Sequence, residues 1–596
     1  MKEVDVNSNL YKLRHSLAHV MAQAVLQIRP NAKLAFGPPV DDGFYYDFDF
    51  DTPITPSDLE VIENKMLQII KEKQQFNFRS IPVDEAIKML QEQGENYKVE
   101  YANELKSKGE VELGFYKNGP FEDMCRGPHV SDTSELPTKA FKIDSIAGAY
   151  WRGDSNNKQL TRLYALAFET KEELESYIKL RELAKERDHR KLGSELEFFT
   201  IEDEVGPGLP LWLPNGTVVR DELEKFAKEV EFRSGYQRVA TPHITKSNLY
   251  YTSGHLPYYK EGMFPPMILD GGQEYFLKPM NCPHHHKIYG TRPRSYRELP
   301  VRLAEYGACY RYEDSGSLSG LLRVRMLNMN DSHIYCRPDQ LREEFRAVLE
   351  LHNFYYKKFR LTDYWMRLSV HDPLNKSKYI DNPEAWKFSE EIIKEVAESV
   401  GKCELGVGEA AFYGPKVDFQ IKNVIGREET ASTNQLDFAG AERFNLTYIA
   451  EDGKQHRPYI IHRAPLGTHE RFLAFLIEHF GGAFPTWMSP TQVKLIPVSE
   501  KFAEYAEKLS NDLRDNLIRS EIDYSAESFK KKIRNAITSK TPNILIIGGR
   551  EVENEEVTWR RYCSEQQHTL KYAEFKDKLI SGISNRIMDN FSDVSF

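Results

Sequence analysis

Alternating apolar and polar positions predict a long antiparallel hairpin near the middle of the chain. Two β-prone runs, Val301 to Tyr312 and Arg323 to Tyr335, flank a loop rich in Ser and Gly. Charged residues occupy its expected inward positions, namely Arg311, Glu313, Arg323, Arg325 and Asp331. One interpretation is a solvated edge hairpin with surface salt bridges. The other is the floor of a phosphate-binding site, because guanidinium groups form bidentate hydrogen bonds with phosphate oxygens.

Helical spacing of apolar residues predicts a helix over residues 12–28. His15 and His19 lie four residues apart in this segment and would share one helical face. Cys125 and His129 repeat the spacing far downstream. The four residues are either unrelated packing residues or a set with the composition of a tetrahedral zinc site.

Three further segments have clear helical signals. Thr170 to Glu173 form a capping box that opens a charged helix with a thin apolar stripe, as expected of a linker. A helix over residues 217–234 leads into a strand ending near Pro242. The helix after Gly467 is apolar on most faces, so Arg471 at its start needs an anionic or aromatic partner.

The C-terminal part alternates between strand and helix patterns. Strands are expected at residues 493–498, near Ile522 and at 544–547, with helices at 501–518 and around Lys530 to Arg534. This order predicts a small α/β domain with a mostly parallel sheet. In isolation, the basic run is better explained as a solvated helix face than as a binding surface.

Length and composition narrow the class of protein. A chain of 596 residues is too long for one core, so three or four domains are expected. The net charge of −10 argues mildly against RNA binding, although a large enzyme can confine its basic surface to one face. Six scattered Cys, a polar N-terminus and the absence of an apolar run of ~18 residues favour a cytosolic protein without a membrane anchor.

Three motifs together resemble the class II aminoacyl-tRNA synthetases. Arg311-Tyr312-Glu313, the Gly-bearing loop and Arg323 resemble motif 2; residues 235–242 resemble motif 1, and residues 467–471 resemble motif 3. The resemblance implies a multidomain α+β and α/β protein with an antiparallel catalytic sheet and a homodimer interface at motif 1. It also implies that Arg311 bridges the α-phosphate of ATP and the substrate carboxylate. Glu313 and Arg323 would place ATP with its Mg²⁺, and Arg471 would hold the adenine and γ-phosphate.

Cys282, His333 and His462 match the zinc ligands of the threonyl-tRNA synthetases. The resemblance implies one Zn²⁺ per subunit, with a fourth coordination position open for L-threonine. A metal that requires a hydroxyl would reject valine, which an apolar pocket separates poorly from threonine. Asp331 would accept the hydroxyl hydrogen bond. The alternative is that the three residues pack separately, and the adjacent His284, His285 and His286 complicate the choice of ligands.

Other positions match the same family less completely. His255, Met280, Tyr413, Lys416 and Gln435 correspond to residues lining its substrate site. Met329 stands where a Gln is frequent, Ala439 where a Ser is common and Ala526 where an Asn is expected near the anticodon. The first two departures affect substrate contacts, and the third weakens the anticodon assignment. Arg534, Glu551 and Arg560 still match anticodon-binding positions.

The N-terminal part looks like the editing domain of bacterial threonyl-tRNA synthetases, which is related to that of the alanyl enzymes. Residues 37–47 and 147–155 carry this resemblance together with the His and Cys pairs. It implies a pocket that hydrolyses seryl-tRNA without a bound metal, formed by His15, His19, Lys98, Asp123, Cys125 and His129. A closed structural zinc site is the competing hypothesis. Bacterial members usually begin with a small β-rich domain, for which the chain leaves no room before His15.

The resulting prediction is a threonyl family enzyme that uses ATP, L-threonine and tRNA(Thr). The expected domains are editing at 1–169, a linker helix at 170–190, catalysis at 191–488 and anticodon binding at 489–596. A prolyl or seryl synthetase is the nearest alternative, but these enzymes lack the Cys/His/His set. A non-catalytic RNA-binding paralogue is the other, although such proteins commonly lose the motif arginines that this chain keeps at Arg311 and Arg471.

Overall fold

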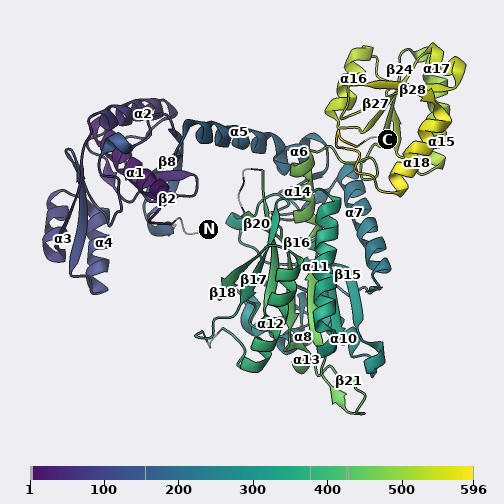
Figure 1. Ribbon diagram of the computed structural model, residues 1–596, viewed down its shortest axis with the longest axis horizontal. Helices are drawn as coiled ribbons and strands as arrows, with labels where there is room; N and C mark the ends of the chain where they lie inside the picture. The colour runs from purple at the N-terminus through teal and green to yellow at the C-terminus, as the bar shows by residue number, and fades with distance from the viewer. Residues whose placement is uncertain (1–4, 155, 376–377, 425, 427, 595–596) are drawn as a thin grey trace. The chain divides into compact units, whose positions relative to one another are not determined.

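The computed structural model describes residues 5–594 except 155, 376–377, 425 and 427. The chain forms two compact units, Met1–Arg181 and Glu182–Phe596 (Figure 1). Their boundary falls inside helix α5 (Lys171–Arg187). None of the helices in the described part of the chain is long and apolar enough to cross a membrane.

The first unit contains a five-stranded sheet in the order β1-β3-β8-β7, with β2 paired to β3. The strands are β1 (Lys33–Leu34), β2 (Pro39–Val40), β3 (Gly43–Asp49), β7 (Phe141–Tyr150) and β8 (Gln159–Ala167). Helices α1 (Asn9–Ile28) and α2 (Pro56–Lys71) share its apolar core. The expected N-terminal helix is confirmed, and it starts at Asn9 because Ser8 caps it by accepting a hydrogen bond from the Tyr11 backbone.

A second, three-stranded sheet in this unit has the order β4-β5-β6. It consists of β4 (Phe76–Pro82), β5 (Glu112–Asn118) and β6 (Phe121–Met124), and α3 (Val83–Glu92) and α4 (Asn96–Ser107) share a core with it. Lys98 lies on α4, Asp123 lies on β6, and Cys125 follows that strand directly. The sheet thus brings the separated candidates for the editing pocket into one unit.

The predicted capping box is confirmed by reciprocal bonds. The Thr170 hydroxyl accepts from the Glu173 backbone at 3.2 Å, and the Glu173 carboxylate accepts from the Thr170 backbone at 3.2 Å. The helix ends at Arg187 instead of running to 190, because Asp188 caps a separate helix, α6 (His189–Glu195), by accepting from the Arg190 backbone.

The second unit is built on an eight-stranded sheet in the order β11-β15-β16-β23-β20-β19-β17-β18. The strands are β11 (Gln237–Arg238), β15 (Val301–Tyr310), β16 (Met326–Cys336), β17 (Tyr364–Val370), β18 (Cys403–Val407), β19 (Lys416–Lys422), β20 (Glu428–Asp437) and β23 (Tyr459–Ala464). The outermost pair at each edge is parallel, and the pairings between them are antiparallel. The predicted antiparallel core is confirmed.

One face of this sheet is covered by four helices, namely α7 (Pro214–Arg233), α11 (Leu341–Lys358), α12 (Pro383–Val400) and α14 (His469–Phe480). Their apolar side chains form one core with Ile334, Leu436 and Ile461 from the sheet. Because successive strand residues point to opposite faces, the neighbours His333, Gln435 and His462 point to the other face. The sheet therefore separates an apolar core from a polar face.

The central hairpin pairs as predicted, with Val301 opposite Tyr335 and Tyr310 opposite Met326. Its charges are placed differently from the expectation. Arg311, Glu313, Arg323 and Arg325 lie beyond the strand ends, whereas Asp331 lies within β16. The loop therefore carries the guanidinium groups of Arg311, Arg323 and Arg325. Most residues of the two strands are buried.

Smaller elements close the polar face. A three-stranded sheet consists of β12 (Ile244–Lys246), β13 (Met267–Ile268) and β14 (Glu274–Leu277). The nearby helices are α8 (Ser247–Ser253), α9 (His255–Tyr259) and α10 (Cys282–Tyr289). Tyr289 of α10 packs with Leu303 and Tyr335 on this face of the sheet.

The C-terminal sheet has the order β25-β24-β26-β27-β28. Its strands are β24 (Val493–Pro497), β25 (Ser520–Ile522), β26 (Asn543–Ile547), β27 (Glu556–Arg561) and β28 (Gln567–Lys571). Its helices are α15 (Ala503–Asp515), α16 (Phe529–Thr538), α17 (Gly549–Asn554) and α18 (Tyr572–Ser584). The expectation of a mostly parallel sheet is wrong, because the pairings of β27 with β26 and β28 are antiparallel.

The segment after α18 packs back onto the part that contains the eight-stranded sheet. Met588 belongs to the same apolar core as α7 and α14. The buried Asp589 carboxylate accepts a hydrogen bond from the Thr486 backbone at 2.8 Å, and Arg586 pairs with Glu229 of α7 at 2.6 Å. The two parts of the second unit therefore share buried contacts.

Candidate active site

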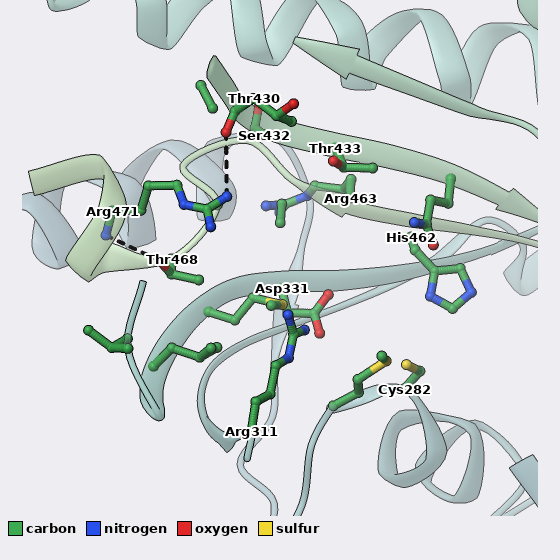
Figure 2. Close-up of a pocket in the computed structure, with 18 of the residues that line it drawn as sticks. Cys282, Arg311, Asp331, Thr430, Ser432, Thr433, His462, Arg463, Thr468 and Arg471 are labelled. Carbon is green, nitrogen blue, oxygen red and sulfur yellow. Dashed lines mark hydrogen bonds between the residues drawn. The ribbon is translucent and has the colours of Figure 1, made fainter. Parts of the chain in front are cut away.

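A cavity of about 300 Å³ opens on the polar face of the eight-stranded sheet (Figure 2). Eleven predicted site residues line it: Met280, Cys282, Arg311, Glu313, Arg323, Asp331, His333, Tyr413, Gln435, His462 and Arg471. Figure 2 shows Arg471 at one end and Cys282 with His462 at the other, with Arg311 between them. Segments almost 200 residues apart in the chain thus meet in one site.

Two arginines enter the cavity with backbone partners only. Arg471 donates to the carbonyl oxygens of Leu322 at 3.1 Å and Thr430 at 3.4 Å. The Arg311 Nε donates to the Pro279 carbonyl at 3.5 Å. Within the described chain, no carboxylate pairs with either guanidinium. Burial and the charge of Arg311 lower the pKa of Arg471, as expected where positive charge gathers to receive an anion.

The motif 2 loop holds a third arginine in a different way. Arg323 forms an ion pair with Glu313 at 2.7 Å, and Arg325 donates to the Glu313 backbone carbonyl at 2.9 Å. Glu313 therefore balances Arg323 and fixes the loop. This arrangement leaves Arg311 and Arg471 as the charges available to a ligand.

Cys282, His333 and His462 bring one ligand atom each within 4.8 Å of one another. They come from α10, β16 and β23, and His333 lies directly opposite His462 in the sheet. The Nε2 of His333 is fully buried and has no hydrogen-bond partner among the described residues. One Cys and two His with an unpartnered nitrogen fit a zinc ion that keeps a fourth position open.

A second donor set shares His462 and contains His286 and Asp437. Its atoms have other partners, since His286 Nδ1 lies 2.9 Å from the Tyr335 hydroxyl and Asp437 accepts from the Gly440 backbone at 2.7 Å. Asp437 also lies 3.2 Å from His462 Nε2 and thereby orients that ring. Sequence reasoning missed Asp437, although its alternation with Gln435 on β20 places both on the polar face.

Asp331 is held by a residue that sequence reasoning also missed. Asn281 donates to the Asp331 carboxylate at 3.1 Å and directly precedes Cys282. A Cβ on Gly307 would come within 2.2 Å of the Asn281 amide oxygen, so Gly307 is needed for this close approach. Across the cavity, the Tyr413 hydroxyl donates to the Gln435 amide oxygen.

Two predicted substrate residues lie outside this cavity. His255 lines a neighbouring cavity of about 220 Å³, and its Nε2 lies 3.1 Å from the Met280 sulfur. Lys416 forms an ion pair with Asp418 at 2.7 Å and lines neither cavity. Of the positions that depart from the family, Met329 lines the first cavity and Ala439 the second.

The four N-terminal candidates also form one cluster. Cys125 Sγ lies 3.2 Å from both His15 Nε2 and His129 Nε2, and His15 Nδ1 donates to the Pro128 carbonyl at 3.2 Å. The His19 ring packs edge-on against His15. Burial lowers the pKa of His15 to about 4 and of His129 to about 2, and raises the pKa of Cys125 to about 11. All three groups are therefore neutral at pH 7.

Lys98 and Asp123 are in direct ionic contact and are both buried. Tyr46, which was not predicted as a site residue, donates its hydroxyl to Asp123 and receives a hydrogen bond from Lys98 at 3.2 Å. Burial lowers the pKa of Lys98 to about 8. Tyr46 lies within residues 37–47, which carry the resemblance to the editing domain, but the sequence does not show its contact with Asp123.

The predicted anticodon residues lie on three elements of the C-terminal part. Arg534 is exposed on α16, and Arg560 lies on β27 with its Nε buried and without a partner among the described residues. Glu551 accepts from the Gly548 backbone at 2.9 Å and from the Thr558 hydroxyl at 2.8 Å. Glu551 therefore caps its own helix, and its carboxylate is already engaged.

Comparison with known families agrees with this architecture. Residues 267–480 match the "tRNA synthetase class II core domain (G, H, P, S and T)", residues 492–581 match the "Anticodon binding domain", and residues 113–164 match the "Threonyl and Alanyl tRNA synthetase second additional domain". The fold and the site thus define a class II aminoacyl-tRNA synthetase.

Curated relatives narrow the family. The chain is 48% identical over 573 residues to a threonine--tRNA ligase of Staphylococcus aureus, covering 96% of this chain and 88% of the relative. It is 47% identical over 582 residues to that of Oceanobacillus iheyensis, covering 97% and 89%. The chain belongs to the threonine--tRNA ligase family. Membership makes it an ATP-dependent aminoacyl-tRNA ligase, so the family prediction is confirmed and the prolyl and seryl alternatives are set aside.

Solved structures show the same likeness. The RNA binding domain of threonyl-tRNA synthetase from Cryptosporidium parvum has a TM-score of 0.64 and 36% identity, covering 68% of this chain and all of that one. A putative threonyl-tRNA synthetase from Aeropyrum pernix has a TM-score of 0.59 and 28% identity, covering 67% and 96%. About two thirds of the chain therefore shares its fold with these two proteins.

Proposed function

We propose that this chain activates L-threonine with ATP to give threonyl-adenylate and then transfers the threonyl group to tRNA(Thr). The observation that carries this proposal is the meeting of two arginines without carboxylate partners and a Cys/His/His cluster in one cavity. The first group suits a triphosphate, and the second suits a hydroxyl-bearing amino acid.

The arginine end of the cavity is proposed to bind ATP with its Mg²⁺. Arg311 would contact the α-phosphate and the threonine carboxylate, and Arg471 would hold the adenine and γ-phosphate. Glu313 and Arg323, which pair at 2.7 Å, would help to place ATP between Arg311 and Arg471. Catalysis would come mainly from positioning and charge neutralisation, because the transferred group brings its own negative charge.

The other end is proposed to hold one Zn²⁺ per subunit on Cys282, His333 and His462. A bound zinc would supply a Lewis-acid site for the amino and hydroxyl groups of threonine, and valine lacks the hydroxyl. Asp331, which accepts a hydrogen bond from Asn281, would also accept one from the threonine hydroxyl. The proposed substrate contacts are completed by His255, Met280, Tyr413, Lys416 and Gln435.

Pyrophosphate exchange tests both ends together. Threonine should support exchange, valine should not, and serine should support it more weakly. A chelator that strips zinc should abolish exchange with threonine. Full exchange by metal-free protein would refute the zinc assignment, and equal exchange with valine would refute the hydroxyl requirement.

We further propose that the N-terminal cluster removes an error which the first site cannot avoid. Serine differs from threonine by one methyl group, worth roughly 1–3 kcal/mol or about 10–200-fold in discrimination. The neutral groups of His15, His19, Cys125 and His129 would orient a water at the ester, and Lys98 with Asp123 would anchor the substrate or carry protons. Hydrolysis of preformed seryl-tRNA tests this directly.

The remaining assignments are proposals of the same kind. We propose domains at 1–169, 170–190, 191–488 and 489–596, with Arg534, Glu551 and Arg560 near the anticodon. Residues 235–242 with the preceding helix α7 are proposed as the homodimer interface, and sedimentation would test whether the chain forms a dimer. The six cysteines are free of disulfides, which favours a reducing cytosol.

A further inference from the structure

The buried imidazole of His285 connects a proposed zinc ligand to a buried carboxylate. Its Nδ1 lies 2.8 Å from His333 Nδ1, and its Nε2 lies 3.1 Å from the Glu305 carboxylate. His285 and His333 are fully buried, and Glu305 is 5% exposed. His285 lies three residues after Cys282 on α10, so one turn of this helix carries a ligand and a partner of another ligand.

The surroundings of Glu305 fix the direction of these hydrogen bonds. Its carboxylate accepts from the Thr241 backbone at 2.7 Å and from the Thr241 hydroxyl at 2.9 Å, and Lys278 lies 3.6 Å away. Lys278 in turn donates to the Thr241 hydroxyl oxygen at 2.8 Å, so that hydroxyl must direct its proton to Glu305. Both Thr241 groups donate to Glu305, and a carboxylate can only accept, so His285 Nε2 carries the proton of its hydrogen bond with Glu305.

The proton positions follow along the chain of contacts. A neutral His285 that is protonated at Nε2 has a lone pair at Nδ1 and accepts there. His333 must then donate from its own Nδ1, which leaves the lone pair of a neutral His333 on Nε2. That nitrogen is the buried one without a partner in the described structure.

We propose that His285, anchored by Glu305, is a positioning residue that fixes the tautomer and ring orientation of His333 for metal binding. The inference rests on the proposed zinc site. A metal-bound His generally donates its second N–H to an acceptor, and loss of that acceptor typically weakens metal binding by about 10–100-fold. Here the acceptor is the imidazole of His285, so Glu305 acts on His333 only through His285.

The two neighbouring histidines differ from His285 and supply a control. Both ring nitrogens of His284 are buried without partners among the described residues, and His286 Nδ1 contacts the Tyr335 hydroxyl. His284→Leu therefore removes an adjacent buried imidazole without touching His333. Its comparison with His285→Leu separates the loss of the Nδ1 acceptor from the loss of ring volume.

The experiment measures the zinc affinity of the full-length, metal-stripped protein by competition with a chromophoric chelator. His285→Leu should bind zinc about 10–100-fold more weakly than wild type, and His284→Leu should stay within about threefold of it. His285→Asn keeps an acceptor oxygen near the position of Nδ1 and should recover most of the affinity. Cobalt absorption bands of each variant report the coordination geometry without any enzymatic assay.

The outcomes separate the two hypotheses. Absence of tight zinc in wild type would overturn the zinc assignment and this inference with it. Tight zinc in wild type together with unchanged affinity in folded His285→Leu would overturn the inference alone. If His285→Leu fails to fold, His285→Asn decides: affinity near wild type supports the acceptor role, and a full 10–100-fold loss refutes it.

Discussion

The molecule contains two clusters of Cys and His side chains that differ in how their polar atoms are satisfied. In the N-terminal cluster, Cys125 contacts His15 and His129, while the far nitrogens of these rings reach Pro128 and Ser16. Among the described residues, His19 Nδ1 is buried without a hydrogen-bond partner. Most polar atoms of this cluster therefore have a partner within the protein.

The catalytic cluster is different because other buried side chains hold the histidine rings that would bind the metal. Asp437 contacts His462, and His285 contacts His333, while His333 Nε2 points to no protein partner in the described structure. The residue types alone would assign both clusters to zinc. Each cluster leaves one buried ring nitrogen without a partner among the described residues, so the contrast lies in what holds the other rings: Pro128 and Ser16 in the first cluster, Asp437 and His285 in the second.

The largest expected effect comes from removing a ligand of the catalytic cluster. Cys282→Ala should lose zinc and lower threonine-dependent pyrophosphate exchange by roughly 10³-fold, because several kcal/mol of metal stabilisation disappear. Metal analysis of the purified protein and the exchange assay check both effects. Cys403→Ala, a partly buried cysteine on β18, is the matched control and should keep its zinc.

Arg311→Ala should come next, with a loss of about 10²–10³-fold in adenylate formation and an unchanged fold. Arg323 of the same loop is paired with Glu313 and is not free to replace the proposed fork of Arg311 on phosphate and carboxylate. Thermal unfolding and pyrophosphate exchange provide the measurements. Arg342→Ala removes a surface arginine paired with Glu395 and should leave exchange unchanged. A loss below tenfold for Arg311→Ala would contradict its assignment.

A smaller and more selective effect is expected in the N-terminal cluster. Cys125→Ala should leave the domain folded and threonine charging normal. Deacylation of seryl-tRNA should be lost, so at equal concentrations of threonine and serine about one tRNA in 10–200 should carry serine, the discrimination left by one missing methyl group. The zinc content should stay at one per subunit. Release of a second zinc would instead make this cluster a structural metal site and remove the contrast between the two clusters.

The smallest effect is expected in the C-terminal part. Arg560→Ala should weaken tRNA charging by about tenfold, in the range of 1–3 kcal/mol for a lost base contact. Adenylate formation without tRNA should not change, because β27 carries no residue of the catalytic cavity. Charging and exchange measured on the same preparation distinguish the two steps. Equal losses in both would assign Arg560 a structural role.

The hairpin pattern and the family resemblance were sufficient to predict several residues of the site, and the fold shows why they meet. Alternation along β16, β20 and β23 puts Asp331, His333, Gln435 and His462 on one face, and the motif arginines bracket the cavity. The strand period of two explains this placement, although only the hairpin was predicted from its sequence pattern and β20 and β23 were not. The central hairpin and the buried helix after Arg471 follow from the same kind of pattern.

Other features depend on contacts that no local pattern encodes. Three consecutive histidines have three different environments, and only the fold shows that His285 is the one that reaches His333 and Glu305. Lys416 matches a substrate position but turns to Asp418. The three predicted C-terminal strands do pair in parallel, but β27 and β28 were not predicted, and their antiparallel pairing makes the sheet mixed.

The return of Met588 and Asp589 to the catalytic core has a consequence for biosynthesis. The apolar core that begins at Leu192 includes Met588, so it stays incomplete until that residue leaves the ribosome. At about 5–20 residues per second, the interval is roughly 20–80 s. During this time the nascent chain exposes apolar surface, and Thr486 lacks its buried carboxylate partner. The full catalytic core can close only after translation of the anticodon-binding part.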